Sequence, residues 1–205
     1  MRNRLAIRYA VQGDLRFISH HDSLRLFKRA VARAAVPVRY SEGFNPRPKL
    51  RIALPRPVGV ASLDELLVLE LTTEEDPADL LTRLSAHVPD GMRLLSADAL
   101  ATGDRRLPVE VQYALELEPE VQQQTARSVA AFLGRPHVLV ERASARMFDI
   151  RPFIRTLSVT DGTLRWTQAV TPEGTPRVGE VLKSLGLSNQ DHLHRVVRQT
   201  ASYRP

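Results

Sequence analysis

The pattern of apolar positions in the first segment predicts a β-strand. Leu5, Ile7, Tyr9 and Val11 recur at every second position. This two-residue period is typical of a strand that buries one face. From about residue 22 to residue 35 the apolar positions recur every three or four residues instead, which predicts an amphipathic helix.

The polar side of this predicted helix is basic. Its cationic positions are Arg25, Lys28, Arg29 and Arg33. Ser19 precedes the helix, where a hydroxyl can cap the free backbone N–H groups. The simplest interpretation is a helix with one face on the core and a solvated basic face opposite.

The remainder of the first half predicts short strands and a second helix. Strands are expected over 37–41, 50–54, 66–72 and 92–99, with a loop over 42–48. Asp76 and Pro77 open a helix that reaches about residue 88, because proline is tolerated in the first helical turn. The order strand, helix, strand, strand, helix, strand is that of the ferredoxin-like split βαβ unit.

The second half predicts a similar order. Strands are expected over 109–117, 137–141, 164–170 and 194–202, and one that includes Ile150 within 148–159, with helices over 119–133 and 177–185. The predicted fold class is therefore α+β, with two tandem ferredoxin-like (βαββαβ) units over 1–100 and 107–205, which could pack as one pseudo-duplicated body. The polar linker between them covers 101–106. A single mixed sheet with additional helices is the alternative.

Composition narrows the class of protein. The chain has 205 residues and is 43% hydrophobic, which is enough for a core. It has no cysteine, so disulfides and thiolate metal sites are excluded. No segment approaches the roughly 18 apolar residues of a membrane span, and no apolar signal core follows the first charges. We expect a cytoplasmic protein without a cofactor.

Charge is distributed unevenly along the chain. Residues 1–60 hold 13 Arg and Lys against 3 Asp and Glu, whereas residues 61–125 hold 4 against 14. The whole chain carries a net charge of +6. A local excess of arginine is typical of a surface that binds phosphates. The acidic middle indicates that one face of the molecule binds while another does not.

A first candidate site lies between the first strand and the helix. It contains Arg16, Ser19, His20, His21 and Asp22. Free N–H groups and the positive end of the helix dipole favour a phosphate or carboxylate here. A histidine in this setting could act as an acid or base, since its ordinary pKa lies near neutrality. The alternative is that these residues only cap the helix.

A second candidate site is the loop that follows. Gly43 permits positive φ, and two prolines stiffen the segment. It presents Phe44, Asn45, Arg47 and Lys49, the mixture of aromatic and cationic groups that binds single-stranded RNA. The alternative is a structural turn with the aromatic ring in the core. Both candidate sites are expected at the same end of the first unit.

Weaker candidates stand in the second half. Arg151 and Arg177 could each bind an anion, although a strand flank and a helix entry explain them as well. His192 and His194 form an H-x-H pair without a third ligand nearby, so no metal site is predicted. Walker, G-x-G-x-x-G, H-E-x-x-H and G-x-S-x-G motifs are absent from the sequence.

Ordered motifs run through the first third of the chain. They are FISHHD (17–22), RAVARA (29–34), VPV (36–38), YSEGFNPRPK (40–49), ALP (53–55) and PVGV (57–60). Together they resemble the DUF2344 family of radical SAM-linked proteins, with weaker support from 149–152 and 177–182. His21 departs from the leucine expected there, whereas His20 and Asp22 match. The resemblance implies a radical SAM protein as partner; without cysteine, this chain cannot hold the iron–sulfur cluster such enzymes need.

These observations lead to one main hypothesis and two alternatives. The main hypothesis is a module that binds RNA or another anionic ligand, as substrate-binding partner of a radical SAM enzyme. The residues expected to contact phosphates are Arg8, Arg16, Arg47, Lys49 and Arg51; Phe44 and Asn45 would contact a base or sugar. The first alternative is a small metal-independent RNA-processing enzyme that uses His20 as catalytic acid or base. The second is a pure protein–protein adaptor.

Overall fold

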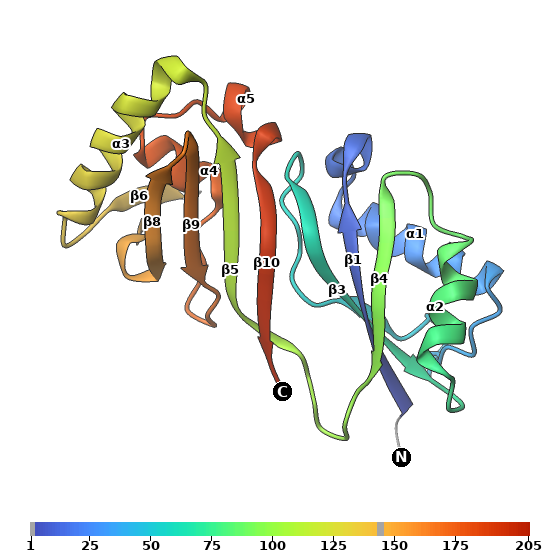
Figure 1. Cartoon of the computed structure of the whole chain (residues 1–205). Helices are drawn as coiled ribbons and strands as arrows, with labels where there is room; N and C mark the ends of the chain where they lie inside the picture. Colours follow the sequence, from blue (N-terminus) through green and yellow to red (C-terminus); the bar gives the residue numbers. More distant parts are fainter. Residues whose placement is uncertain (1–2, 143–145) are drawn as a thin grey trace. The chain divides into compact units, whose positions relative to one another are not determined.

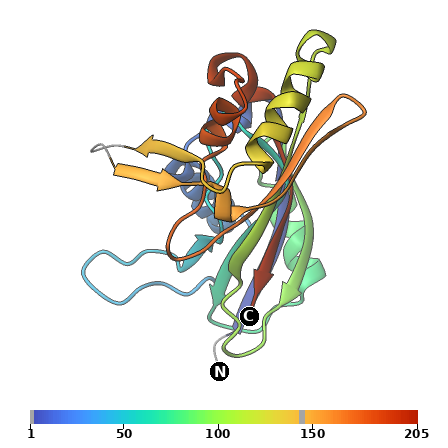
Figure 2. The ribbon, with the colours of Figure 1, turned by 90° about the vertical axis from the view of Figure 1, so that its left-hand side faces the viewer.

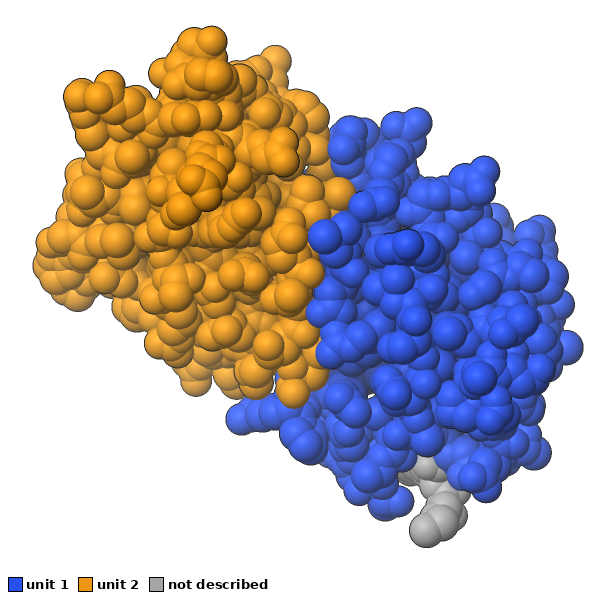
Figure 3. Space-filling view, in the orientation of Figure 1, with its two compact units in different colours: residues 1–58, 62–107, 204–205 blue, residues 59–61, 108–203 orange. Residues whose placement is uncertain are grey.

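The structure, a computed structural model, describes residues 3–142 and 146–205 and is a mixed α/β fold with mostly antiparallel strands (Figure 1). It divides into two units (Figure 3). Unit 1 comprises residues 1–58, 62–107 and 204–205, and unit 2 comprises residues 59–61 and 108–203. Within the described ranges, no helix combines the length and the apolar character needed to cross a membrane.

Unit 1 contains one sheet and two α-helices. The strands are β1 (Asn3–Val11), β2 (Leu50–Ile52), β3 (Ala61–Leu71) and β4 (Met92–Ala99). The helices are the 3-10 turn η1 (Gly13–Phe17), α1 (His20–Arg33) and α2 (Pro77–Ser85). β1 pairs with β3 and β4, and β2 pairs with β3, all antiparallel. The element order βαββαβ and the helix expected from residue 22 agree with the sequence patterns.

The core of unit 1 lies on one face of this sheet. The alternating residues Leu5, Ile7, Tyr9 and Val11 of β1 are all buried, as their two-residue period predicts. They form one cluster with Phe27 of α1, whose ring meets Tyr9 edge-on at 4.9 Å, and with apolar residues of α2. Both helices therefore cover the same face, and the polar side of α1 points away from the core.

The strand predicted over 37–41 is not formed as a strand. Val38 bridges Leu71 and Tyr40 bridges Pro48, each as an isolated pair. Leu50 of β2 pairs with Leu69 on the same edge of β3. Because β2 occupies this edge at Leu67–Leu69, the segment 37–41 contacts β3 only at the last residues of that strand.

Unit 2 contains four β-strands and a separate hairpin. The strands are β5 (Leu107–Glu116), β8 (Ile154–Thr160), β9 (Thr163–Ala169) and β10 (Val197–Arg204), and they pair in the order β10-β5-β9-β8. The helices are α3 (Pro119–Leu133), η3 (Arg151–Phe153), α4 (Val178–Ser184), α5 (Asn189–His192) and η4 (Leu193–Arg195). The hairpin joins β6 (Leu139–Arg142) and β7 (Arg146–Asp149).

The hairpin of β6 and β7 was only partly predicted, because a strand that includes Ile150 was expected within 148–159, whereas β7 ends at Asp149 and β8 begins at Ile154. Arg142 binds both carboxylate oxygens of Glu180 in α4, at 2.7 Å each. The guanidinium also lies 3.7 Å from the centre of the Phe148 ring. The Arg142–Glu180 contact joins residues 38 positions apart, so no local pattern could indicate it.

Candidate anion-binding site

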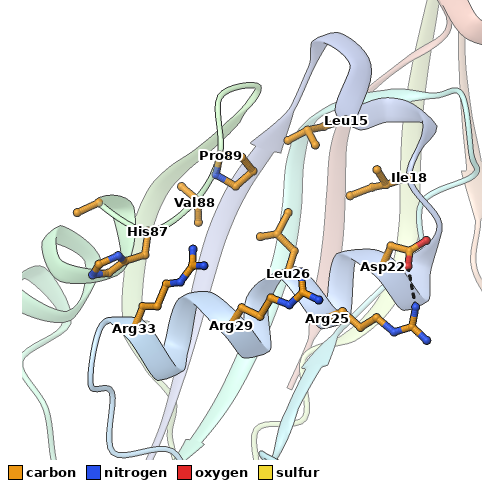
Figure 4. Close-up of a pocket in the computed structure, with 11 residues that line it drawn as sticks. Leu15, Ile18, Asp22, Arg25, Leu26, Arg29, Arg33, His87, Val88 and Pro89 are labelled. Carbon is orange, nitrogen blue, oxygen red and sulfur yellow. Dashed lines mark hydrogen bonds and ion pairs between the residues drawn. The ribbon is translucent and has the colours of Figure 1, made fainter.

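The polar side of α1 forms one wall of a groove in unit 1 (Figure 4). The groove has a volume of about 540 Å³. Arg25, Arg29 and Arg33 line its cationic wall. The segment after α2 and the turn before α1 form the opposite side. The residues on that side and the floor are Leu15, Ile18, Leu26, Ala86, His87, Val88 and Pro89.

The three arginines follow one another because of their spacing. A step of four residues is slightly more than one helical turn and advances about 6 Å along the axis. The guanidinium groups therefore form a row on one side of α1, as Figure 4 shows. Like charges four residues apart destabilise an isolated helix by about 0.2–0.5 kcal/mol per pair. The repulsion within this row therefore destabilises α1, and an anion bound in the groove would offset that destabilisation.

Only the first arginine of the row is paired. Arg25 lies 3.2 Å from the carboxylate of Asp22. Arg29 and Arg33 are exposed, and neither has a hydrogen bond or ion pair with another residue in the described part of the chain. Two full cationic charges are therefore available to a ligand.

Ser19 and Asp22 form the cap of α1. The Ser19 hydroxyl accepts from the backbone N–H of Asp22 at 3.1 Å and donates to its carboxylate at 2.7 Å. This hydrogen bond is the main reason why the pKa of Asp22 lies below its ordinary value, and the nearby Arg25 lowers it further. The two side chains thus contact each other and the helix terminus, while Asp22 also reaches the edge of the groove.

Arg16 and His20 stand at the same end of α1. The Arg16 guanidinium lies 5.1 Å from the centre of the Phe17 ring. Arg16 Nε and His20 Nδ1 are buried and have no hydrogen-bond partner among the residues described. Burial, and secondarily the neighbouring His21, lower the pKa of His20. The imidazole is therefore neutral at pH 7, and it does not line the groove.

The loop between residues 41 and 48 is held by hydrogen bonds at its base, and its tip is exposed. Ser41 N–H donates to the Arg47 carbonyl at 2.8 Å, and Arg47 N–H donates to the Ser41 hydroxyl at 3.0 Å. Figure 2 shows the loop as a light-blue extension that stands away from the sheet. Phe44 is fully exposed (103%), and Asn45 and Arg47 are also exposed. The alternative of an aromatic ring tucked into the core is therefore wrong.

Three further predicted residues lie on the sheet face opposite the helices. Arg8, between two core-facing residues of β1, forms an ion pair with Asp64. Arg51 precedes the buried Ile52 and donates to the Arg105 carbonyl. Lys49 lies 3.9 Å from the carboxylate of Glu70. Each of these cations already has a contact within unit 1.

The two predicted clusters do not share one end of unit 1. Lys49 hydrogen-bonds through its carbonyl to Glu70 N–H, and Glu70 pairs with Arg4 at the start of β1. Residues 16–22 instead follow the far end of β1, after Val11. Since β1 has nine residues and each rises about 3.3 Å, roughly the length of the sheet separates the clusters. The expectation that both clusters lie at the same end of the first unit is therefore wrong.

Arg151 and Arg177 have local contacts in unit 2. Arg151 donates to the Leu133 carbonyl at 3.4 Å, and its guanidinium lies 5.9 Å from the centre of the Phe132 ring. Arg177 stands before α4, where its backbone N–H donates to Glu180 at 2.8 Å. Among the described residues, no group of three or more His, Asp or Glu side chains is placed to hold a metal ion.

A comparison with protein families gives one match. The family model described as "Uncharacterized protein conserved in bacteria (DUF2344)" matches residues 4–181. The chain belongs to the DUF2344 family. The resemblance inferred from the motifs in the first third is thereby confirmed, and the match includes every residue of the groove in this DUF2344 protein.

Other comparisons add little to the family assignment. A search of the curated proteins finds no match to the DUF2344 chain. Among solved structures, an unknown protein from Galdieria sulphuraria is 13% identical over the whole of both chains, with a TM-score of 0.29. A structural likeness of this degree carries no argument about fold or function.

Sequence reasoning missed the groove in this DUF2344 protein. The signal was visible in part, because Arg25, Arg29 and Arg33 recur at intervals of four. They were interpreted as a solvated face. The opposite side, at Val88 and Pro89, comes from a segment more than 50 residues further along, and only the tertiary structure brings it next to α1.

Proposed function

We propose that this DUF2344 protein binds RNA, or another ligand with the same phosphate chemistry, through the groove beside α1. The observation that carries the proposal is the pair Arg29 and Arg33, two exposed cations without a partner in the described structure that face the same groove. Arginine binds phosphate oxygens through two parallel N–H groups. A row of such groups is what recognition of successive phosphates requires.

The spacing of the row supports a polyanion over a single anion. The three guanidinium groups extend over about 12 Å along the helix axis. This length is on the scale that separates a few successive phosphates in one nucleic-acid strand. A single carboxylate or phosphate would engage one of Arg29 and Arg33 and leave the other unpaired.

The remaining predicted residues would contact the ligand outside the groove, as separate contacts at different ends of unit 1. Arg16 stands at one end of α1, and Phe44, Asn45 and Arg47 are exposed on the loop. An aromatic ring on a cationic loop suits stacking with an unpaired base. Arg8, Lys49 and Arg51 contribute less in this proposal, because each already contacts a residue of unit 1.

We also propose that each unit is a ferredoxin-like βαββαβ unit. In unit 1 the strands follow the order β4-β1-β3, with β2 on β3; in unit 2 the order is β10-β5-β9-β8. The two orders correspond if the hairpin of β6 and β7 is an insertion. This correspondence supports an origin by duplication.

The partnership with a radical SAM protein remains part of the proposal. It is supported by the family resemblance and by the absence of cysteine from the sequence. A chain that binds RNA but cannot hold an iron–sulfur cluster fits the role of a substrate-binding subunit.

A filter-binding titration tests the proposed function. Labelled RNA of about 20 nucleotides is titrated with the full chain between about 50 and 200 mM salt. Three phosphate contacts to a single strand predict that log K falls with log salt at a slope of about −2, since each contributes about 0.7. A dissociation constant weaker than about 10⁻⁴ M that does not change with salt would contradict the proposal.

The same titration examines the alternative in which His20 is a catalytic residue. A neutral imidazole with a buried, unbonded Nδ1 favours this alternative. The RNA recovered after binding is analysed on a denaturing gel. Intact RNA with the unmodified protein excludes the alternative; cleavage that His20→Ala abolishes while binding persists would establish it.

A further inference from the structure

The two sides of the groove differ in chemistry. Arg25, Arg29 and Arg33 form a cationic wall, at one end of which Asp22 pairs with Arg25. Ile18, Val88 and Pro89 face this wall from segments outside α1 (Figure 4). Leu26, which follows Arg25 directly on α1, contributes to the floor between the two sides. A ligand that fills this groove must present negative charge on one side and an apolar surface on the other.

His87 adds an aromatic ring to the apolar side. In Figure 4 its ring lies at the end of the groove next to Arg33. Histidine is one of the side chains on which unpaired bases stack. Among the residues that line the groove it provides the flat surface that the aliphatic side chains lack.

Nucleic acids differ in whether they can meet both requirements. A duplex has its phosphates outside and its bases paired inside, so its base faces cannot reach an apolar wall while the phosphates contact the arginines. A single strand can turn its phosphates to one side and its bases to the other. Linear polyphosphate has the charge but no apolar surface.

We infer that the groove holds a short single-stranded segment, with phosphates on Arg25, Arg29 and Arg33 and bases against Val88, Pro89 and His87. This inference rests on the proposed function and adds the strandedness of its ligand. The volume of about 540 Å³ lies in the range of pockets that enclose a small organic molecule, about 300–1,000 Å³. It accommodates a segment of only a few nucleotides.

The experiment compares three probes on the full chain. They are a single-stranded RNA, the same RNA annealed to its complement, and linear polyphosphate of matched charge, measured directly or by competition at about 150 mM salt. The inference predicts that the single strand binds at least about tenfold more tightly than either of the others, since one stacked base alone accounts for about this factor. Equal or tighter binding of the duplex or the polyphosphate overturns it.

The outcomes separate this inference from the proposed function. If the duplex binds as well as the single strand, with a steep salt dependence, the phosphate contact stands and the single-strand inference fails. If no probe binds, both fail.

Two substitutions test the apolar side directly. Val88→Ser and His87→Ala should each weaken single-strand binding by about fivefold, without changing the salt slope or the affinity for polyphosphate. Val58→Ser is the matched control, because Val58 is half exposed in unit 1 and does not line the groove. The inference fails if folded variants at both positions bind the single strand like the unmodified protein.

Discussion

Phe44 shows how a single residue can be placed for contact instead of for folding. Its ring is fully exposed at the tip of a loop whose base is fixed by two hydrogen bonds between Ser41 and Arg47. Gly43 beside it has a φ of +128°, which a side chain would strain. An apolar ring in water contributes nothing to the core, so its place in the loop is explained better by a ligand.

The substitution Phe44→Ala distinguishes a role in ligand contact from a role in folding stability. The free energy of unfolding should change by less than about 0.5 kcal/mol, since the ring packs against nothing in the core. RNA affinity should fall by about fivefold or more, as expected for loss of one stacked base. Urea unfolding and filter binding measure the two effects. A destabilised protein, or one with unchanged affinity, would be evidence against a contact role.

The residue scale also marks the limit of what could be predicted. The sequence indicates that Arg8, Arg29 and Arg33 are all on polar faces, and the structure agrees. It does not indicate which of them remain unpaired. Asp64, the partner of Arg8, is 56 residues away and lies beside it only through the pairing of β1 with β3. Availability for a ligand is thus a tertiary property.

At the scale of elements, the strongest local patterns were predicted correctly. The period of β1 and the three- to four-residue period of α1 each give an element with nearly the expected ends. The segment over 37–41 was predicted incorrectly. Its apolar residues fit a strand, but β2 already occupies the edge of β3. Local propensity cannot decide between two segments for one edge.

The hairpin of β6 and β7 should depend on Glu180. Burial alone would raise the pKa of Glu180, but hydrogen bonds from Arg142 and from the Arg177 backbone hold it below its ordinary value of 4.5. A depressed pKa in the folded state means that this stabilisation is present above pH 4.5 and is lost as the pH falls through the folded value. Glu180→Gln should therefore destabilise unit 2 by about 2 kcal/mol at pH 7, and by less in acid.

Urea unfolding followed by the fluorescence of Trp166 measures this effect. Trp166 is the only tryptophan of the sequence and is buried in unit 2. Glu141→Gln is the control, because Glu141 is exposed on the same hairpin; it should stay within about 0.5 kcal/mol of the unmodified protein. Equal destabilisation by both variants, or a Glu180→Gln effect that does not shrink in acid, would argue against the ion pair as the cause.

At the scale of the whole molecule, folding brings charged residues from the basic and the acidic segments of the sequence together. The first 60 residues carry a large basic excess and the next 65 a matching acidic one. Strands from both segments pair within unit 1, so that Asp64 and Glu70 meet Arg8 and Lys49. Two cations of the basic excess are thereby paired with carboxylates on the sheet, whereas Arg29 and Arg33 beside α1 have no partner in the described part of the chain. Net charge by segment therefore indicates the sign of the proposed binding surface but not its position.

The most direct measurement compares two double variants of equal charge. Arg29→Gln with Arg33→Gln removes two cations from the groove, and Lys28→Gln with Arg93→Gln removes two from unit 1 outside it. We predict that the first reduces the salt slope of single-stranded RNA binding by about 1.4 and weakens affinity at least tenfold, while the second changes neither appreciably. Equal losses in both variants, or none in the first, would show that the groove is not where this protein binds its ligand.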